Sequence, residues 1–136
     1  KIRKKIVSEL PFNTKYFSFI HQSAIILGND IEIGEGTFIG AYSIITTNIK
    51  IGNHTILNRM NQIGHDCVIG DFFSAMPGSI VSGNVNIKDS VYLGNNSCIR
   101  ENLTIHKDTT IGMNGSVIKD ITEPGVYVGV PVKKIK

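Results

Sequence analysis

Residues 33–45 have the sequence Ile-Gly-Glu-Gly-Thr-Phe-Ile-Gly-Ala-Tyr-Ser-Ile-Ile, in which an aliphatic residue returns at every sixth position. The spacing continues in both directions, and glycine often follows the aliphatic residue. The sixth-position residues are Leu27, Ile33, Ile39, Ile45, Ile51, Leu57, Ile63, Ile69, Ala75, Val81, Ile87, Leu93, Ile99, Ile105, Ile111 and Val117. A helix repeats every ~3.6 residues and a strand every two, so neither keeps this register over about ninety residues.

A period of six is typical of a parallel β-helix, in which three hexads form one triangular coil. Residues eighteen positions apart then stack, and the core is buried between neighbouring coils. We therefore predict an all-β domain over residues 21–136. Residues 1–20 are expected to hold an amphipathic helix (1–10) that ends near Pro11 and a short strand-like lead-in (12–20). Residues 126–130 and Pro131 predict a closing strand and turn.

The composition excludes several classes of protein. The net charge is +3, but half of the basic residues lie near the two ends, which does not form a nucleic-acid-binding stripe. No apolar run is long enough to cross a membrane, and the basic start is not followed by the apolar stretch of a signal peptide. Cys67 and Cys98 occupy different hexad positions and are not expected to pair. This favours a reduced, cytoplasmic setting, with Cys67 as a small buried residue.

The four histidines are the first candidates for chemistry. His21, His54, His65 and His106 fall in four different hexad columns, so no two of them stack within one chain. Hexapeptide-repeat carbonic anhydrases need three histidines that converge on zinc across a subunit interface. The spacing predicts no such site, although a set formed between subunits stays open.

His65 differs from the other histidines because a carboxylate, Asp66, follows it directly. A carboxylate can hold one ring nitrogen protonated and orient the other toward a nucleophile's proton, which is a general-base arrangement. One coil above lies Gly83, whose backbone N–H could stabilise an oxyanion. The alternatives are a surface histidine in a turn and a glycine that only relieves a tight corner.

The motifs around His65 resemble one family. Asn58, the run Gly-His-Asp-Cys-Val-Ile-Gly-Asp at 64–71, Ser-Gly-Asn at 82–84 and Gly-Val-Pro-Val-Lys-Lys at 129–134 are similar to the sialic acid O-acetyltransferases and nucleotide-linked amino-sugar N-acetyltransferases. The resemblance covers essentially the whole chain. It implies a trimer of left-handed β-helices that binds acetyl-CoA between subunits and needs no metal.

The resemblance also implies roles for individual residues. His65 would be the general base, and Asp66 would raise its basicity. Asn58 would lie near the acceptor sugar, and Gly83 would donate to the thioester carbonyl. The CoA arm would follow Asn95 and Met113, which share a column with Pro77 and Pro131, toward Lys133 and Lys134.

The chain departs from the family pattern in two ways. Many members carry a second histidine, close to the acetyl group, nine residues after the base, where this chain has Ser74. We expect Ser74 to contact the cofactor through a hydrogen bond of shorter reach. Members also begin with a small α/β domain that holds the nucleotide-sugar, and residues 1–10 resemble its last helix. The acceptor, and the choice between N- and O-acetylation, therefore stay open.

Two main functions are consistent with the sequence. The first is an acetyl-CoA-dependent acetyltransferase that acts on an amino or hydroxyl group of a nucleotide-linked sugar in surface-glycan biosynthesis, with His65 as base. The alternative is a non-catalytic trimeric scaffold, since fold does not fix function. An ice- or mineral-binding face would need an unbroken column of threonines. Thr37, Thr55 and Thr109 share a hexad position, but other residues interrupt them.

Overall fold

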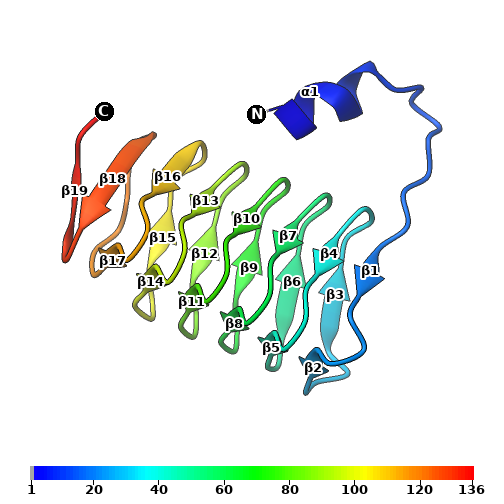
Figure 1. The fold of residues 1–136 in the computed structure, drawn as a ribbon, viewed down its shortest axis with the longest axis horizontal. Helices are drawn as coiled ribbons and strands as arrows, with labels where there is room; N and C mark the ends of the chain where they lie inside the picture. The colour runs from blue at the N-terminus through cyan, green and yellow to red at the C-terminus, as the bar shows by residue number, and fades with distance from the viewer. Residues whose placement is uncertain (1) are drawn as a thin grey trace.

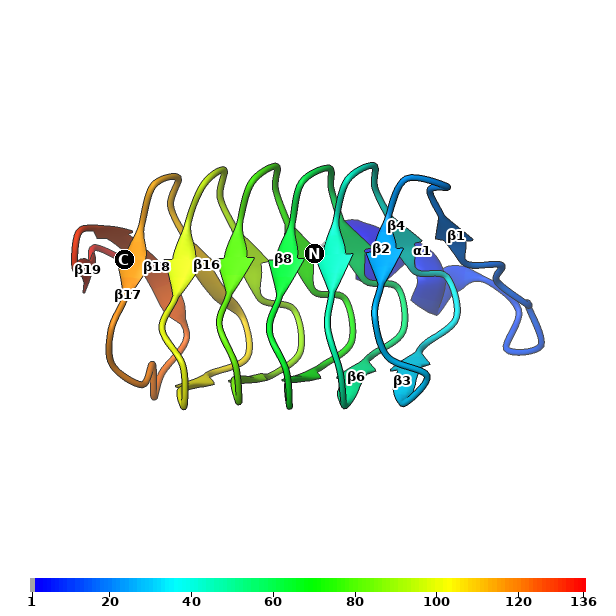
Figure 2. The same ribbon diagram turned by 90° about the horizontal axis from the view of Figure 1, so that it is seen from below.

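The computed structural model describes residues 2–136, which fold into a left-handed parallel β-helix of six coils with one short helix beside it (Figure 1). The strands form three sheets, one along each side of a triangular prism (Figure 2). The predicted fold class is therefore confirmed. No helix within residues 2–136 has the length and apolarity needed to cross a bilayer.

The three sheets follow one another around each coil. Sheet A contains β1 (Phe19–Ile20), β4 (Phe38–Ile39), β7 (Ile56–Leu57), β10 (Ser74–Ala75), β13 (Tyr92–Leu93), β16 (Thr109–Ile111), β18 (Gly125–Gly129) and β19 (Val132–Lys134). Sheet B contains β2 (Ile25–Ile26), β5 (Ile44–Ile45), β8 (Gln62–Ile63), β11 (Ile80–Val81), β14 (Cys98–Ile99) and β17 (Ser116–Val117). Sheet C contains β3 (Ile31–Ile33), β6 (Ile49–Ile51), β9 (Val68–Ile69), β12 (Asn86–Ile87) and β15 (Thr104–Ile105).

The register of the strands confirms the stacking rule for most of the chain. In sheet A, Phe38 pairs with Ile56, and in sheet B Ile44 pairs with Gln62. The prediction is wrong at its first member, because Ile26 and not Leu27 pairs with Ile45. The first coil has one residue more than the later coils, which places Leu27 outside with 64% of its surface exposed. Ile26 takes the inward position of that coil, and the regular spacing of six begins at Ile33.

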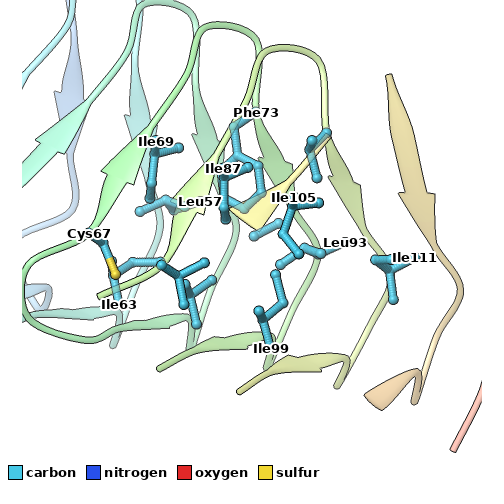
Figure 3. Packing of buried hydrophobic residues seen from close by; sticks show 14 of the residues in the cluster. Leu57, Ile63, Cys67, Ile69, Phe73, Ile87, Leu93, Ile99, Ile105 and Ile111 are labelled. Carbon is cyan, nitrogen blue, oxygen red and sulfur yellow. The ribbon is translucent and has the colours of Figure 1, made fainter. Parts of the chain in front are cut away.

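The interior is filled by the sixth-position residues, one from each strand from β3 to β17, and Figure 3 shows several of them. From Ile39 onward each of them is at most 4% exposed. Cys67 is also fully buried among them, as predicted, and both cysteines are free. Because every coil stacks its apolar residues on the next, the core is a continuous column rather than a globule.

The corners between sheets have a period of six of their own. Every sixth residue from Gly36 to Asn114 has a positive φ, between 52° and 74°. This left-handed conformation is tolerated best by glycine, asparagine and aspartate, and several corners carry those residues. Each such turn directs the chain from one sheet to the next and so determines the direction of the side chain just before it.

The two ends close the prism differently. Helix α1 (Ile2–Glu9) is confirmed and lies over sheet A, on the opposite side of the prism from sheet B (Figures 1 and 2). The lead-in predicted for residues 12–20 forms a strand only at Phe19–Ile20. At the other end β18 joins sheet A, and β19 pairs with it antiparallel, which confirms the predicted closing strand and turn.

Candidate functional site

His65 lies at the corner between β8 of sheet B and β9 of sheet C, with 65% of its side chain exposed. Its Nδ1 is 2.7 Å from Oδ2 of Asp66, which takes the left-handed corner conformation with φ of 59°. A carboxylate can only accept, so the Nδ1–H donates to it. The Nε2 atom is then left to accept a proton. This is the pairing that the sequence predicted.

A third residue, Asn48, holds the carboxylate from the coil below. Its Nδ2 donates to Oδ1 of Asp66 over 2.6 Å. The hydrogen bonds from His65 and, second, from Asn48 hold the pKa of the Asp66 carboxyl below its usual range. Asp66 is therefore ionised at neutral pH with both oxygens engaged. Asn48 was not predicted as a site residue, although it lies one coil before Asp66 in the same column.

Gly83 lies directly against the imidazole. A Cβ atom at Gly83 would come within 2.5 Å of Nε2 of His65, so any larger residue would displace the ring. Gly83 is buried beneath the ring, and its N–H donates to no other described residue. A ligand oxygen that accepts from this N–H would lie beside the imidazole. The structure thus brings together His65, Asp66 and Gly83.

Asn58 lies at a different corner, between sheets A and B. Its carbonyl accepts from Oγ of Ser43 at 2.9 Å and from Nδ2 of Asn61 at 2.6 Å. Its own Oδ1 accepts from the backbone of Arg59 at 2.8 Å. The Asn58 amide group is thereby oriented, while its Nδ2 donates to no residue among 2–136. No motif in the sequence indicated that Asn61, which is fully buried, fixes this corner.

Asn95 and Met113 stack on the same corner as Asn58, farther along the helix. The backbone N–H of Asn96 donates to the Pro77 carbonyl at 3.0 Å, and that of Asn114 to the Asn95 carbonyl at 2.8 Å. These bonds confirm the predicted column for Pro77, Asn95 and Met113. Pro131 does not share it, because the last coil is two residues shorter: Ile111 pairs with Tyr127, so position 129 follows Met113. Met113 is 73% exposed, which leaves an apolar side chain available to a ligand.

Pro131 and Lys133 lie at the C-terminal end of the prism. Together with Ile118 and Lys119, which follow β17, they line a hollow of about 270 Å³. Ile118 and Lys119 leave sheet B on the side where His65 leaves it three coils earlier. The hollow therefore lies beside the closing hairpin, three coils beyond His65 on the same edge of the prism.

Ser74 is on sheet A, within β10, and not beside His65 in this chain. Its Oγ is 3.0 Å from Nη2 of Arg3, which reaches it from helix α1. One chain therefore presents the predicted site residues on separate parts of its surface: His65, Asp66 and Gly83 on one corner, Asn58, Asn95 and Met113 on another, and Ser74 on sheet A. Within residues 2–136, no group of three or more His, Cys, Asp or Glu residues is arranged to hold a metal ion.

Several known proteins are similar to this chain in sequence or in structure. No protein-family model matches the chain. GDP-perosamine N-acetyltransferase of Escherichia coli O157:H7 is 30% identical over 74% of this chain and 46% of that protein. A probable mitochondrial UDP-3-O-acylglucosamine N-acyltransferase of Arabidopsis thaliana is 33% identical over 80% of this chain and 35% of that protein. The chain thus spans less than half the length of these relatives.

Solved structures extend the likeness over nearly the whole chain. WeeI from Acinetobacter baumannii AYE superposes with a TM-score of 0.92 and 32% identity, over 98% of this chain and 66% of that one. A variant of perosamine N-acetyltransferase from Caulobacter crescentus was solved in complex with CoA and GDP-perosamine. It superposes with a TM-score of 0.94 and 26% identity, over 99% of this chain and 64% of that one. The chain carries the β-helix of the hexapeptide-repeat acyltransferases. The resemblance seen in the sequence is therefore confirmed.

Proposed function

We propose that the protein transfers an acetyl group from acetyl-CoA to an amino or hydroxyl group of a nucleotide-linked sugar. The observation that carries this proposal is the arrangement of Asn48, Asp66, His65 and Gly83, which combines an oriented base with a neighbouring backbone donor. The relatives named as sugar N-acetyltransferases and N-acyltransferases, and the neighbour crystallised with CoA and GDP-perosamine, support the substrate classes.

The reaction follows from these positions. The acceptor's nitrogen or oxygen attacks the thioester carbonyl while Nε2 of His65 takes its proton. The Gly83 N–H donates to the oxygen, which becomes negative in the tetrahedral intermediate. The intermediate collapses, the C–S bond breaks, and the imidazolium returns the proton to the CoA thiolate. Asp66 stabilises the transient imidazolium and fixes the ring.

The separation of the site residues in one chain leads us to propose a homotrimer. A neighbouring subunit would bring its Asn95 and Met113 corner, or its Ser74, toward the His65 corner of the first. The CoA arm would then follow Asn95 and Met113 toward Pro131 and Lys133, and Asn58 would contact the acceptor. We place the reaction in the cytoplasm, where free cysteines stay reduced.

The test is acetyl transfer by the His65→Ala variant. Turnover should fall by roughly 10²–10⁴-fold, the usual contribution of a general base, with little change in the affinity for acetyl-CoA. CoA release, measured with a nucleotide-linked amino sugar as acceptor, gives the rate. His106→Ala is the matched control, because His106 lies at another corner and its Nδ1 contacts only the Lys107 carbonyl. Near wild-type turnover by His65→Ala would contradict the catalytic role and favour the scaffold.

A further inference from the structure

The face of sheet A beneath helix α1 holds a second polar cluster, centred on Arg3 and separate from the His65 corner of the same chain. Nη2 of Arg3 donates to the carbonyls of Phe72 at 3.0 Å and Phe73 at 3.2 Å, and to Oγ of Ser74 at 3.0 Å. Beside it, Nζ of Lys4 lies 5.7 Å above the centre of the Phe72 ring. The side chains of α1 thus place two positive charges against one strand end.

The Arg3 guanidinium lacks a compensating charge. No carboxylate in residues 2–136 forms an ion pair with it, and its Nε is buried without a hydrogen-bond partner among them. Partial burial lowers the pKa of Arg3, which shows that the charged form is losing hydration. Placing a cation in such surroundings costs free energy unless an anion or further acceptors satisfy it.

The surroundings of Arg3 leave room for such an anion. Arg3, Lys4, Ser74, Ser90 and Tyr92 line a hollow of about 390 Å³, and no acidic residue lines it. Ser90 and Tyr92 also line the adjoining hollow, of about 600 Å³, which reaches Lys136 and the β18 strand and is lined by one carboxylate, that of Asp108. The two hollows share a wall, so an extended ligand could occupy both.

We propose that Arg3, Lys4 and the Ser74 hydroxyl bind a phosphoryl group in this hollow. Phosphate oxygens accept strong hydrogen bonds from guanidinium, ammonium and hydroxyl groups. The proposal rests on the proposed function for its two candidate ligands, the nucleoside diphosphate of the acceptor and CoA. Both carry phosphates, and the hollow recognises that shared chemistry.

The experiment measures binding rather than turnover. The full chain is titrated calorimetrically with GDP and, separately, with CoA, at low and at moderate salt. Arg3→Gln and Lys4→Gln should each weaken one of the two probes by about tenfold and reduce the salt dependence of its binding. Lys5→Gln is the matched control, because Lys5 is the next residue of α1 and instead faces Glu9, 3.7 Å away. The probe whose binding is weakened by these variants identifies the ligand.

Several outcomes would overturn the proposal. One is that the wild-type chain binds neither probe, and another is that both variants bind both probes as the Lys5→Gln control does. If Arg3→Gln loosens α1, Lys4→Gln still decides, since Lys4 only contacts the face of Phe72. The proposed function can fail separately. If the chain binds a probe through Arg3 and Lys4 but releases no CoA with any sugar acceptor, the phosphoryl site is supported and the acetyltransferase function is contradicted.

Discussion

At the scale of single residues, the corner geometry decides which side chains can act. The left-handed conformation of Asp66 turns its carboxylate back onto the ring that precedes it, and Gly83 leaves the space in which the ring rests. His65, Asp66 and Gly83 could be found from the sequence because stacking at eighteen positions places them together. Asn48 obeys the same rule but carries no motif. Arg3 could not be found, because its contact with Ser74 depends on the irregular path of residues 10–18.

Gly83→Ala should impair catalysis more than stability. The new methyl group would meet Nε2 of His65 at 2.5 Å, and the ring, being the end of a side chain, would rotate away. We expect turnover to fall by about tenfold or more, because the base loses its position. The melting temperature should change little.

Gly64→Ala is the contrasting control. A methyl group there would meet the backbone nitrogen of Gly83 at 2.6 Å, which cannot move without distorting the coil. This variant should lose stability. If Gly83→Ala instead unfolds the protein and leaves the specific activity of the folded fraction intact, Gly83 is needed for the turn and not for the position of His65.

Asn48→Gly should lower turnover without unfolding the chain. Glycine accepts the φ of 52° at this corner, while the hydrogen bond to Asp66 is lost. The pKa of the Asp66 carboxyl should then rise toward its usual value. Because that pKa is lowered in the folded wild type, its contribution to stability is present above the usual value and is lost as the pH falls. The stability difference between variant and wild type should therefore shrink toward acid pH.

Asn102→Gly separates this effect from a general loss of corner bonds. Asn102 has the same conformation, with φ of 61°, and accepts an equivalent hydrogen bond from Asn84 at 2.7 Å. It lies two coils beyond His65 and should leave turnover unchanged. Equal rate losses in both variants, measured as kcat at saturating acetyl-CoA, would mean that Asn48 has no specific role in orienting Asp66.

At the scale of elements, β10 shows how the repeat tolerates an exception. Ala75 is the one small residue among the inward positions from Ile39 to Val117, where its neighbours in sheet A are Leu57 and Leu93. Phe73, two residues earlier, is fully buried and points into the same interior (Figure 3). We expect the larger ring to fill the volume that alanine leaves. The sequence predicted the register of this strand but not the compensation, because period alone does not report volume.

This compensation can be measured with a double-mutant cycle. Phe73→Ala should reduce the free energy of unfolding by about 3–5 kcal/mol, as for other buried aromatic truncations. Ala75→Leu alone should cost about 1–3 kcal/mol through overpacking. The double variant should be more stable than the sum of the two losses predicts, by denaturant titration. Strictly additive losses would show that the two side chains occupy independent spaces.

At the scale of the whole molecule, the three sides of the prism differ in what they offer to a partner. Sheet C presents a Lys50–Glu32 ion pair at 3.2 Å, and α1 covers part of sheet A. Sheet B presents Ile44 and Ile80, which line a shallow apolar hollow of about 190 Å³ next to Ser82. Sheet B also lies between the His65 corner and the Asn58 corner, so a subunit packed on it would touch both.

The position of sheet B makes the proposed interface testable with a single charged side chain. In a ring of three subunits one surface meets a different surface of the next copy, so a charge in the middle of sheet B should open every interface. Ile80→Glu, at a position 39% exposed, should convert a trimeric mass into that of one chain by light scattering and should abolish acetyl transfer. Val68→Glu is the matched control, because Val68 faces outward from sheet C and is 47% exposed. It pairs with Lys50, whose ammonium group can form an ion pair with the new carboxylate. A trimer that survives Ile80→Glu and dissociates with Val68→Glu would place the interface on sheet C. A wild-type mass of one chain would contradict the trimer itself, and the two corners would then need another partner to complete the site.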